Sequence, residues 1–113
     1  MIEKSIKKNE KTSKRFLTKE KIISILKKEN PFLKKKYHVS RLGIFGSYAR
    51  GDYTEKSDVD ILVEFSKPLG FEYFDLNQYV EQKLKKNVDL VNIKALHRVI
   101  KDTVLSESEF IKS

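Results

Sequence analysis

The sequence contains no cysteine, which excludes both disulfide bonds and thiolate metal sites. It has no run of about 18 apolar residues, the length that a membrane-spanning helix needs. The first ten residues, MIEKSIKKNE, are too polar for the apolar core of a signal peptide. At 113 residues, the chain has room for one small hydrophobic core. These features predict a soluble, single-domain protein of the cytoplasm that has no contact with a membrane.

Positive charge exceeds negative charge, and the excess is unevenly placed. The chain has 24 Lys and Arg residues against 16 Asp and Glu residues, a net charge of +8. Residues 1–15 hold six of the basic residues and only two of the acidic ones. We therefore expect a basic, disordered leader at 1–15 and one folded domain at 16–113. A basic surface could favour nucleic acid or an acidic partner, but lysines on solvated helix faces explain the charge more simply.

Apolar spacing and turn residues divide the chain into alternating helices and strands. Thr18 suits the N-cap of a first helix, which we expect Asn30-Pro31 to interrupt before a second short helix ends at Lys36. Strands are expected at 39–46, 58–65 and 88–93, and helical segments at 47–50, 71–86 and 94–111. This order predicts an α/β (α+β) fold, a small mixed sheet of three or slightly more strands flanked by helices.

The segment DVDILVEF places two aspartates at the start of the strand at 58–65. Side chains two residues apart on a strand project the same way, with Cα atoms about 6.5–7 Å apart, so Asp58 and Asp60 can reach one point. Carboxylate oxygens are the ligands that Mg²⁺ prefers. An aspartate before a strand is often only a loop residue or a cap. Asp60, however, sits inside an apolar run, where an unpaired carboxylate is costly.

Two further features accompany the aspartate pair. Gly46-Ser47 follows a strand and opens a helical turn, where backbone N–H groups can bind a phosphate and glycine permits close approach. Taken alone, the dipeptide is more simply explained by Ser47 as an ordinary N-cap. Asp89 lies within the next strand and faces the pair if the two strands are neighbours. Three carboxylates beside a phosphate-binding turn are what two-metal phosphoryl transfer requires.

The spacing of these residues matches a known signature. GS, ten further residues and DVD correspond to the G-S-x10-D-x-D pattern of the DNA polymerase β-like nucleotidyltransferase superfamily. The surrounding FGSYARGDYTEKSDVDILVEF resembles the minimal members of that superfamily, the MNT antitoxins of HEPN/MNT toxin–antitoxin systems. The resemblance runs from about Thr18 to the final helix. It implies a polymerase β-like nucleotidyltransferase fold.

The resemblance also implies roles for individual residues. Gly46 and Ser47 would hold the phosphates of ATP. The carboxylates would bind two Mg²⁺ ions and serve catalysis, and they are Asp58, Asp60 and Asp89. For Arg50, two roles stay open: a contact to phosphate, or an ion pair with Asp52 or Glu55 that holds the loop.

The activity that the resemblance implies is Mg²⁺-dependent transfer of AMP from ATP onto a tyrosine hydroxyl of a cognate HEPN ribonuclease toxin, which inactivates the toxin. A chain this short lacks an acceptor lobe, so a hetero-oligomer with the toxin is expected. One alternative is a non-catalytic antitoxin that neutralises the toxin by binding. The other is a nucleotidyltransferase that acts on nucleic acid or a small molecule, for which the basic leader and the lysine clusters are the best support.

Overall fold

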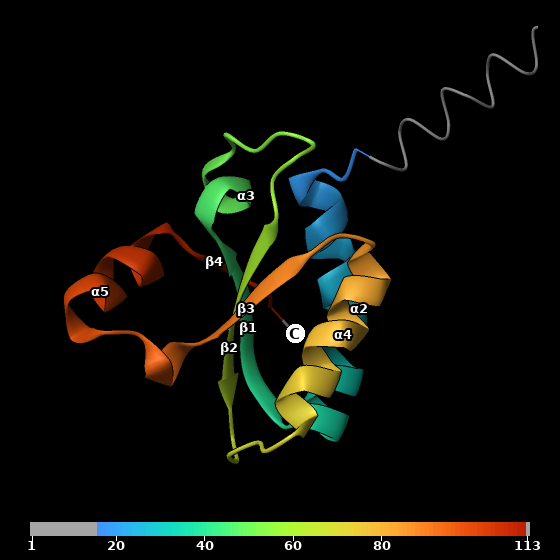
Figure 1. The fold of residues 1–113 in the computed structure, drawn as a ribbon, viewed down its shortest axis with the longest axis vertical. Helices are drawn as coiled ribbons and strands as arrows, with labels where there is room; N and C mark the ends of the chain where they lie inside the picture. Colours follow the sequence, from blue (N-terminus) through green and yellow to red (C-terminus); the bar gives the residue numbers. More distant parts are fainter. Residues whose placement is uncertain (1–15, 113) are drawn as a thin grey trace, which may run out of the picture.

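The computed structural model describes residues 16–112, so the expected leader at 1–15 lies outside the described residues. The elements, shown in Figure 1, are α2 (Lys19–Tyr37), β1 (Val39–Phe45), α3 (Gly46–Arg50), β2 (Val59–Phe65), α4 (Glu72–Leu84), β3 (Val88–Asn92), the 3₁₀ turn η1 (Ile93–Ala95), α5 (Arg98–Glu107) and β4 (Glu109–Phe110). Every helix within residues 16–112 is too short or too polar to span a lipid bilayer.

Four strands form a single sheet in the order β3-β2-β1-β4. Strand β1 runs antiparallel to both β2 and β4, whereas β2 and β3 are parallel. The predicted mixed sheet flanked by helices is therefore confirmed, with β4 as a fourth strand. Strand β2 lies between β1 and β3, and its alternate residues Val59, Ile61 and Val63 are all fully buried.

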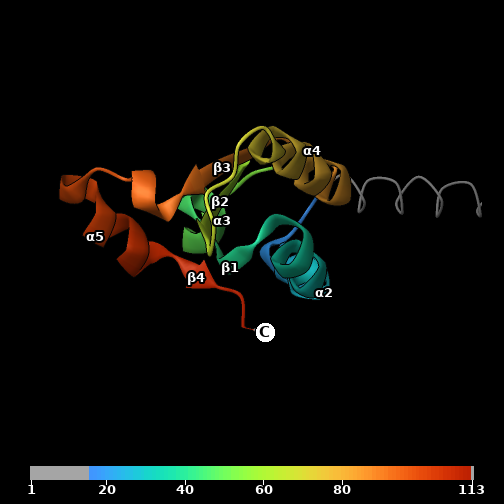
Figure 2. The ribbon, with the colours of Figure 1, turned by 90° about the horizontal axis from the view of Figure 1, so that it is seen from below.

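The two faces of the sheet are covered unequally. Helices α2 and α4 pack on one face and α5 lies on the other, as Figure 2 shows. The main core lies under α2 and α4, and its largest aliphatic members include Ile22, Leu26, Leu33, Ile44, Ile61 and Leu76. Helix α5 buries none of its residues. The α5 side of the sheet is therefore the more open one.

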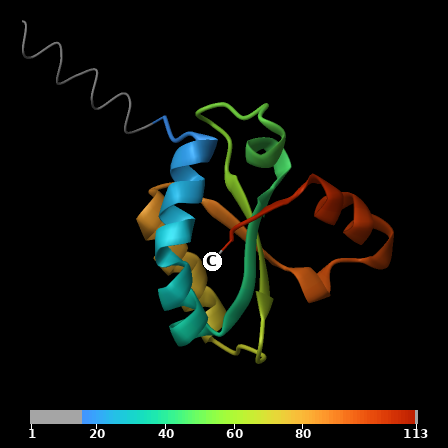
Figure 3. The same ribbon diagram turned by 180° about the vertical axis from the view of Figure 1, so that it is seen from behind.

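One end of the sheet gathers several segments that are distant in the sequence. Figure 3 shows α3, the loop after it and the start of α2 at this end. Lys19, the first residue of α2, donates from Nζ to the Ala49 carbonyl oxygen at 3.3 Å. The hydroxyl of buried Tyr48 donates to the Leu17 carbonyl oxygen at 3.0 Å. These bonds join α3 rigidly to the body of the domain.

The prediction that Asn30-Pro31 divides the first helix is wrong. Helix α2 begins as expected, with Thr18 Oγ1 accepting from the Lys21 N–H, but it continues through Pro31 to Tyr37. An interior proline costs about 3 kcal/mol, because it removes one hydrogen bond and crowds the preceding turn. Burying one large apolar side chain contributes about 1.5–3 kcal/mol, and α2 buries such side chains on both sides of the proline, at Ile22, Leu26 and Leu33.

The prediction of one helix over 94–111 is also wrong. The segment divides into η1, α5 and β4, and α5 starts after His97, whose Nδ1 accepts from the Val99 N–H. Strand β4 pairs with β1 where Gly43 lies opposite Phe110. A Cβ at Gly43 would lie only 2.9 Å from Phe110 Cδ1, so the missing side chain makes room for the ring. Glycine in β1 thus permits a fourth strand.

The proline in α2 leads to a stability prediction. Pro31→Ala restores an N–H that can donate to the Lys27 carbonyl oxygen and removes the ring clash. Greater freedom of the unfolded chain offsets about 0.4–1 kcal/mol of this gain. We expect the free energy of unfolding to rise by about 2 kcal/mol, measured by urea denaturation.

Lys34→Ala on the exposed side of the same helix serves as the control, and it should change stability by less than about 0.5 kcal/mol. A Pro31→Ala protein no more stable than this control would show that α2 already accommodates proline without loss.

Candidate active site

The backbone of Gly46 lies directly against the carboxylate of Asp60. Phe45 pairs with Asp60 in the β1–β2 ladder, so the next residue of the chain reaches the Asp60 side chain. A Cβ at Gly46 would overlap Asp60 Oδ2. Gly46 also has a φ of +70°, in the left-handed region that other residues avoid. Only glycine meets both demands at this position.

Helix α3 starts at this glycine and is one short turn, as predicted from SYAR. Its N-cap is Phe45, which offers no side-chain acceptor to the first N–H groups of the helix. Gly51 ends α3 at a φ of +92°, and its N–H donates to the Ser47 carbonyl oxygen at 2.9 Å. Gly46 and Ser47 therefore lie at the α3 start, beside Asp60, with backbone donors that no capping side chain occupies.

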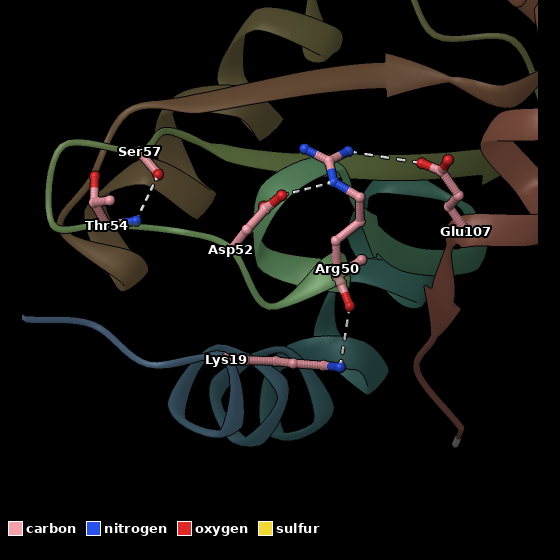
Figure 4. A network of polar contacts seen from close by, with 7 residues as sticks. Lys19, Arg50, Asp52, Thr54, Ser57 and Glu107 are labelled. Atoms are coloured by element: carbon pink, nitrogen blue, oxygen red, sulfur yellow. Dashed lines mark hydrogen bonds and ion pairs between the residues drawn. The ribbon is translucent and has the colours of Figure 1, made fainter.

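The loop between α3 and β2 is held by its own hydrogen bonds. The Thr54 N–H donates to Ser57 Oγ at 2.9 Å, and the Ser57 N–H donates to the Thr54 carbonyl oxygen at 3.0 Å (Figure 4). Lys86 Nζ donates to the Glu55 carbonyl oxygen at 2.7 Å, which ties the loop to the segment before β3. The ten-residue spacing between Ser47 and the aspartate pair is thus a structured connection.

The three predicted carboxylates come from neighbouring strands. Asp60 lies opposite Asp89 in the parallel β2–β3 ladder, and Asp58 lies just before β2. The expectation that Asp89 faces the pair across the sheet is confirmed. Asp58 and Asp89 are exposed, whereas Asp60 is half-buried. Burial raises the pKa of Asp60, and the charges of Asp89 and Asp58 raise it further, while the charge of Arg50 lowers it.

Arg50 forms ion pairs with two carboxylates. Its Nε lies 3.2 Å from Asp52 Oδ2, and its Nη1 lies 3.7 Å from Glu107 Oε1 (Figure 4). Of the loop partners that the sequence left open, the structure shows Asp52. Glu107 was missed, because it belongs to α5 and no local pattern links it to the Gly-Ser turn. The hydrogen bond to Asp52 raises the pKa of Arg50.

The chemistry of this group of residues fits Mg²⁺. Among residues 16–112, no three His, Cys, Asp or Glu side chains converge closely enough to form a complete metal cage. Mg²⁺ does not need one, since it is usually held by one or two carboxylates together with waters and substrate phosphates. Asp60 supplies a half-buried carboxylate whose nearest charged neighbours include two further carboxylates. A hard cation would relieve the repulsion among them.

Comparison with known proteins gives the family. Residues 19–111 match the nucleotidyltransferase domain family. The chain belongs to this family. The protein adenylyltransferase MntA of Thermococcus cleftensis is 42% identical to it over 96 residues, which cover 84% of this nucleotidyltransferase and 97% of MntA. The chain is therefore a nucleotidyltransferase that is similar to MntA.

Solved structures agree with this assignment. A protein described as a minimal nucleotidyltransferase matches with a TM-score of 0.71 at 28% identity, covering 82% of this chain and 95% of that one. A toxin–antitoxin structure with AMP-PNP matches with a TM-score of 0.63 at 26% identity, covering 86% of this chain and 74% of that one. The predicted nucleotidyltransferase fold is therefore confirmed.

The repulsion around Asp60 leads to a second stability prediction. Because the folded state raises the pKa of this carboxyl, the folded nucleotidyltransferase binds its proton more tightly than the unfolded chain does. Stability therefore falls as pH rises from the unfolded value, about 4, through the raised folded value. Asp60→Asn removes the charge and should raise the Tm at neutral pH in metal-free buffer. The gain should disappear below about pH 4, as thermal melts across the pH range would show.

Glu64→Gln provides a matched control on the same strand. Glu64 is half-buried like Asp60, but it lies opposite Arg41 in the β1–β2 ladder and has a cationic neighbour. We expect no gain from this change at neutral pH. Equal Tm changes for the two variants, or a loss for Asp60→Asn, would contradict the repulsion that we assign to Asp60.

Proposed function

We propose that this chain transfers AMP from ATP, with Mg²⁺, onto a tyrosine hydroxyl of a cognate HEPN toxin and thereby inactivates the toxin. The observation that carries the proposal is the position of Asp60, which faces Asp89 across two parallel strands and packs on Gly46. Donor-binding and carboxylate groups are thus adjacent. The names of the relatives support the reaction class, since MntA is a protein adenylyltransferase and a related toxin–antitoxin structure contains AMP-PNP.

The turn at the start of α3 would bind the phosphates of ATP. Gly46 has no side chain to block them, and the first N–H groups of α3 have no capping side chain. The hydroxyl of Ser47 adds a further donor. Arg50 belongs to the same short helix, and its positive charge would attract a phosphate at this site.

The three carboxylates would hold two Mg²⁺ ions, which supply charge neutralisation at the phosphates and make the acceptor hydroxyl more acidic. In the transfer itself, the tyrosine oxygen forms a bond to the α-phosphorus of ATP as the bond to pyrophosphate breaks. The hydroxyl proton passes to a carboxylate. Asp89 suits this role best, because it is exposed and an incoming protein can reach it, whereas Asp60 is half-buried against Gly46.

The open face of the sheet supports a protein acceptor. Asp60 and Asp89 lie on the face that α5 shares, and α5 buries none of its own residues there. Space next to the carboxylates is therefore accessible to a partner. A partner that brings its own tyrosine would complete a site that otherwise has donor and metal groups alone. The cytoplasm is the compartment that we propose for this reaction, since it supplies both ATP and Mg²⁺.

The proposal is tested by intact-mass analysis of the cognate HEPN protein after incubation with this chain, ATP and Mg²⁺. We expect mass increments of AMP on the toxin, located on a tyrosine by fragmentation. Asp60→Asn should slow the transfer by roughly 10²- to 10³-fold, the scale of losing one electrostatic group from an active site.

Asp102→Asn serves as the charge-matched control, because Asp102 is an exposed residue of α5 outside the carboxylate group. Its transfer rate should equal that of the unmodified chain. An inactivated toxin of unchanged mass that co-purifies with the chain would support a binding antitoxin instead. Labelling of RNA in place of the toxin would support a nucleic-acid substrate.

A further inference from the structure

Glu107, the last residue of α5, contacts Arg50 of α3, although the two residues are far apart in the sequence. Its Oε1 lies 3.7 Å from Arg50 Nη1, and Asp52 Oδ2 lies 3.2 Å from Arg50 Nε. Figure 4 shows the guanidinium held between these two carboxylates, which come from different segments of the fold. One arginine thus receives support from both its own loop and a separate helix.

The two carboxylates contact the guanidinium from different directions. An arginine carries donors on three nitrogen atoms, Nε, Nη1 and Nη2. The printed contacts join Asp52 to Nε and Glu107 to Nη1, so the two carboxylates meet the guanidinium at different nitrogen atoms. The planar guanidinium suits phosphate oxygens, and Arg50 is the cation whose charge acts on Asp60. A guanidinium that is held by two carboxylates has a fixed orientation toward a ligand.

We propose that Glu107 is a positioning residue for ATP: together with Asp52, it fixes the Arg50 guanidinium so that it can donate to a phosphate oxygen. The inference rests on the proposed function, since it assumes that Arg50 faces the donor phosphates. A free arginine side chain loses rotamer freedom when it binds, whereas one that is already held loses less. Glu107 therefore strengthens phosphate binding without touching the nucleotide.

The link also couples α5 to the nucleotide. Helix α5 buries no residue of its own and leaves Val99 and Ile100 exposed. The ion pair between Glu107 and Arg50 is one of the contacts that join α5 to α3. Coupling between two sites is reciprocal. If Glu107 supports phosphate binding, bound phosphate must in turn stabilise the position of α5.

The test is a double-mutant cycle on the full chain with calorimetric binding of ATP and of adenosine, which has the same base and ribose without phosphate. Glu107→Gln should weaken ATP binding by about two- to fivefold, the range for an exposed ion pair, and leave adenosine binding unchanged. In an Arg50→Ala background, Glu107→Gln should have no further effect. Asp102→Asn, which removes the same charge from the same helix, should alter neither affinity.

Hydrogen exchange of α5 provides a second readout that does not depend on transfer activity. ATP should slow exchange of the α5 amides in the unmodified chain and have little effect on them in Glu107→Gln. Equal losses of ATP and adenosine affinity would show a merely structural role and overturn the inference. Tighter ATP binding in Glu107→Gln would also overturn it, because the carboxylate would then compete with phosphate.

The outcomes separate this inference from the proposed function. ATP binding that depends on Glu107, without AMP transfer to the toxin, would support the inference and contradict the proposed reaction. AMP transfer with ATP affinity unaffected by Glu107→Gln would overturn the inference alone. Failure of the unmodified chain to bind ATP would overturn both.

Discussion

The contact between the Gly46 backbone and the Asp60 carboxylate is the constraint on which the rest of the site depends. It fixes residue type, because any side chain at position 46 would overlap Asp60 Oδ2. It also fixes the strand register, because Asp60 reaches Gly46 only while it lies opposite Phe45. The parallel β2–β3 ladder then places Asp89 beside Asp60. Two strand registers therefore place the turn at Gly46 and the carboxylate of Asp89 next to Asp60.

This assembly opposes the stability of the empty domain, since like charges gather around a half-buried carboxyl. The fold tolerates the repulsion because the opposite face of β2 is fully buried at Val59, Ile61 and Val63. A one-residue slip of β2 would relieve Asp60 but would expose that row of apolar side chains. Burial of the apolar face of β2 thus keeps the repelling carboxylate in place on its opposite face. A cation-dependent site requires this arrangement.

The sequence predicts the positions of Asp60 and Asp89 on neighbouring strands better than it predicts the periphery of the fold. Alternation in DVDILVEF places Asp60 correctly within β2, although β2 begins one residue after Asp58, and Asp89 follows from strand adjacency. The errors at Pro31 and at the C-terminus have non-local causes. Packing along all of α2 outweighs one proline, and β4 forms because Gly43 in a distant strand leaves room for Phe110. Neither cause is visible within a short window of sequence.

The contact of Glu107 with Arg50 could not be predicted from a short window of sequence either. Only the path of the chain through η1 and α5 brings Glu107 to Arg50. A minimal domain has few elements with which to orient a donor nucleotide. The face that presents Asp60 and Asp89 must also stay open if an acceptor protein is to approach, so no additional lobe can cover it. Glu107 holds Arg50 from the edge of that face, and it belongs to a helix that buries no residue of its own. This arrangement is consistent with both demands. In the proposed function, it would orient a group for phosphate binding and leave the carboxylates accessible.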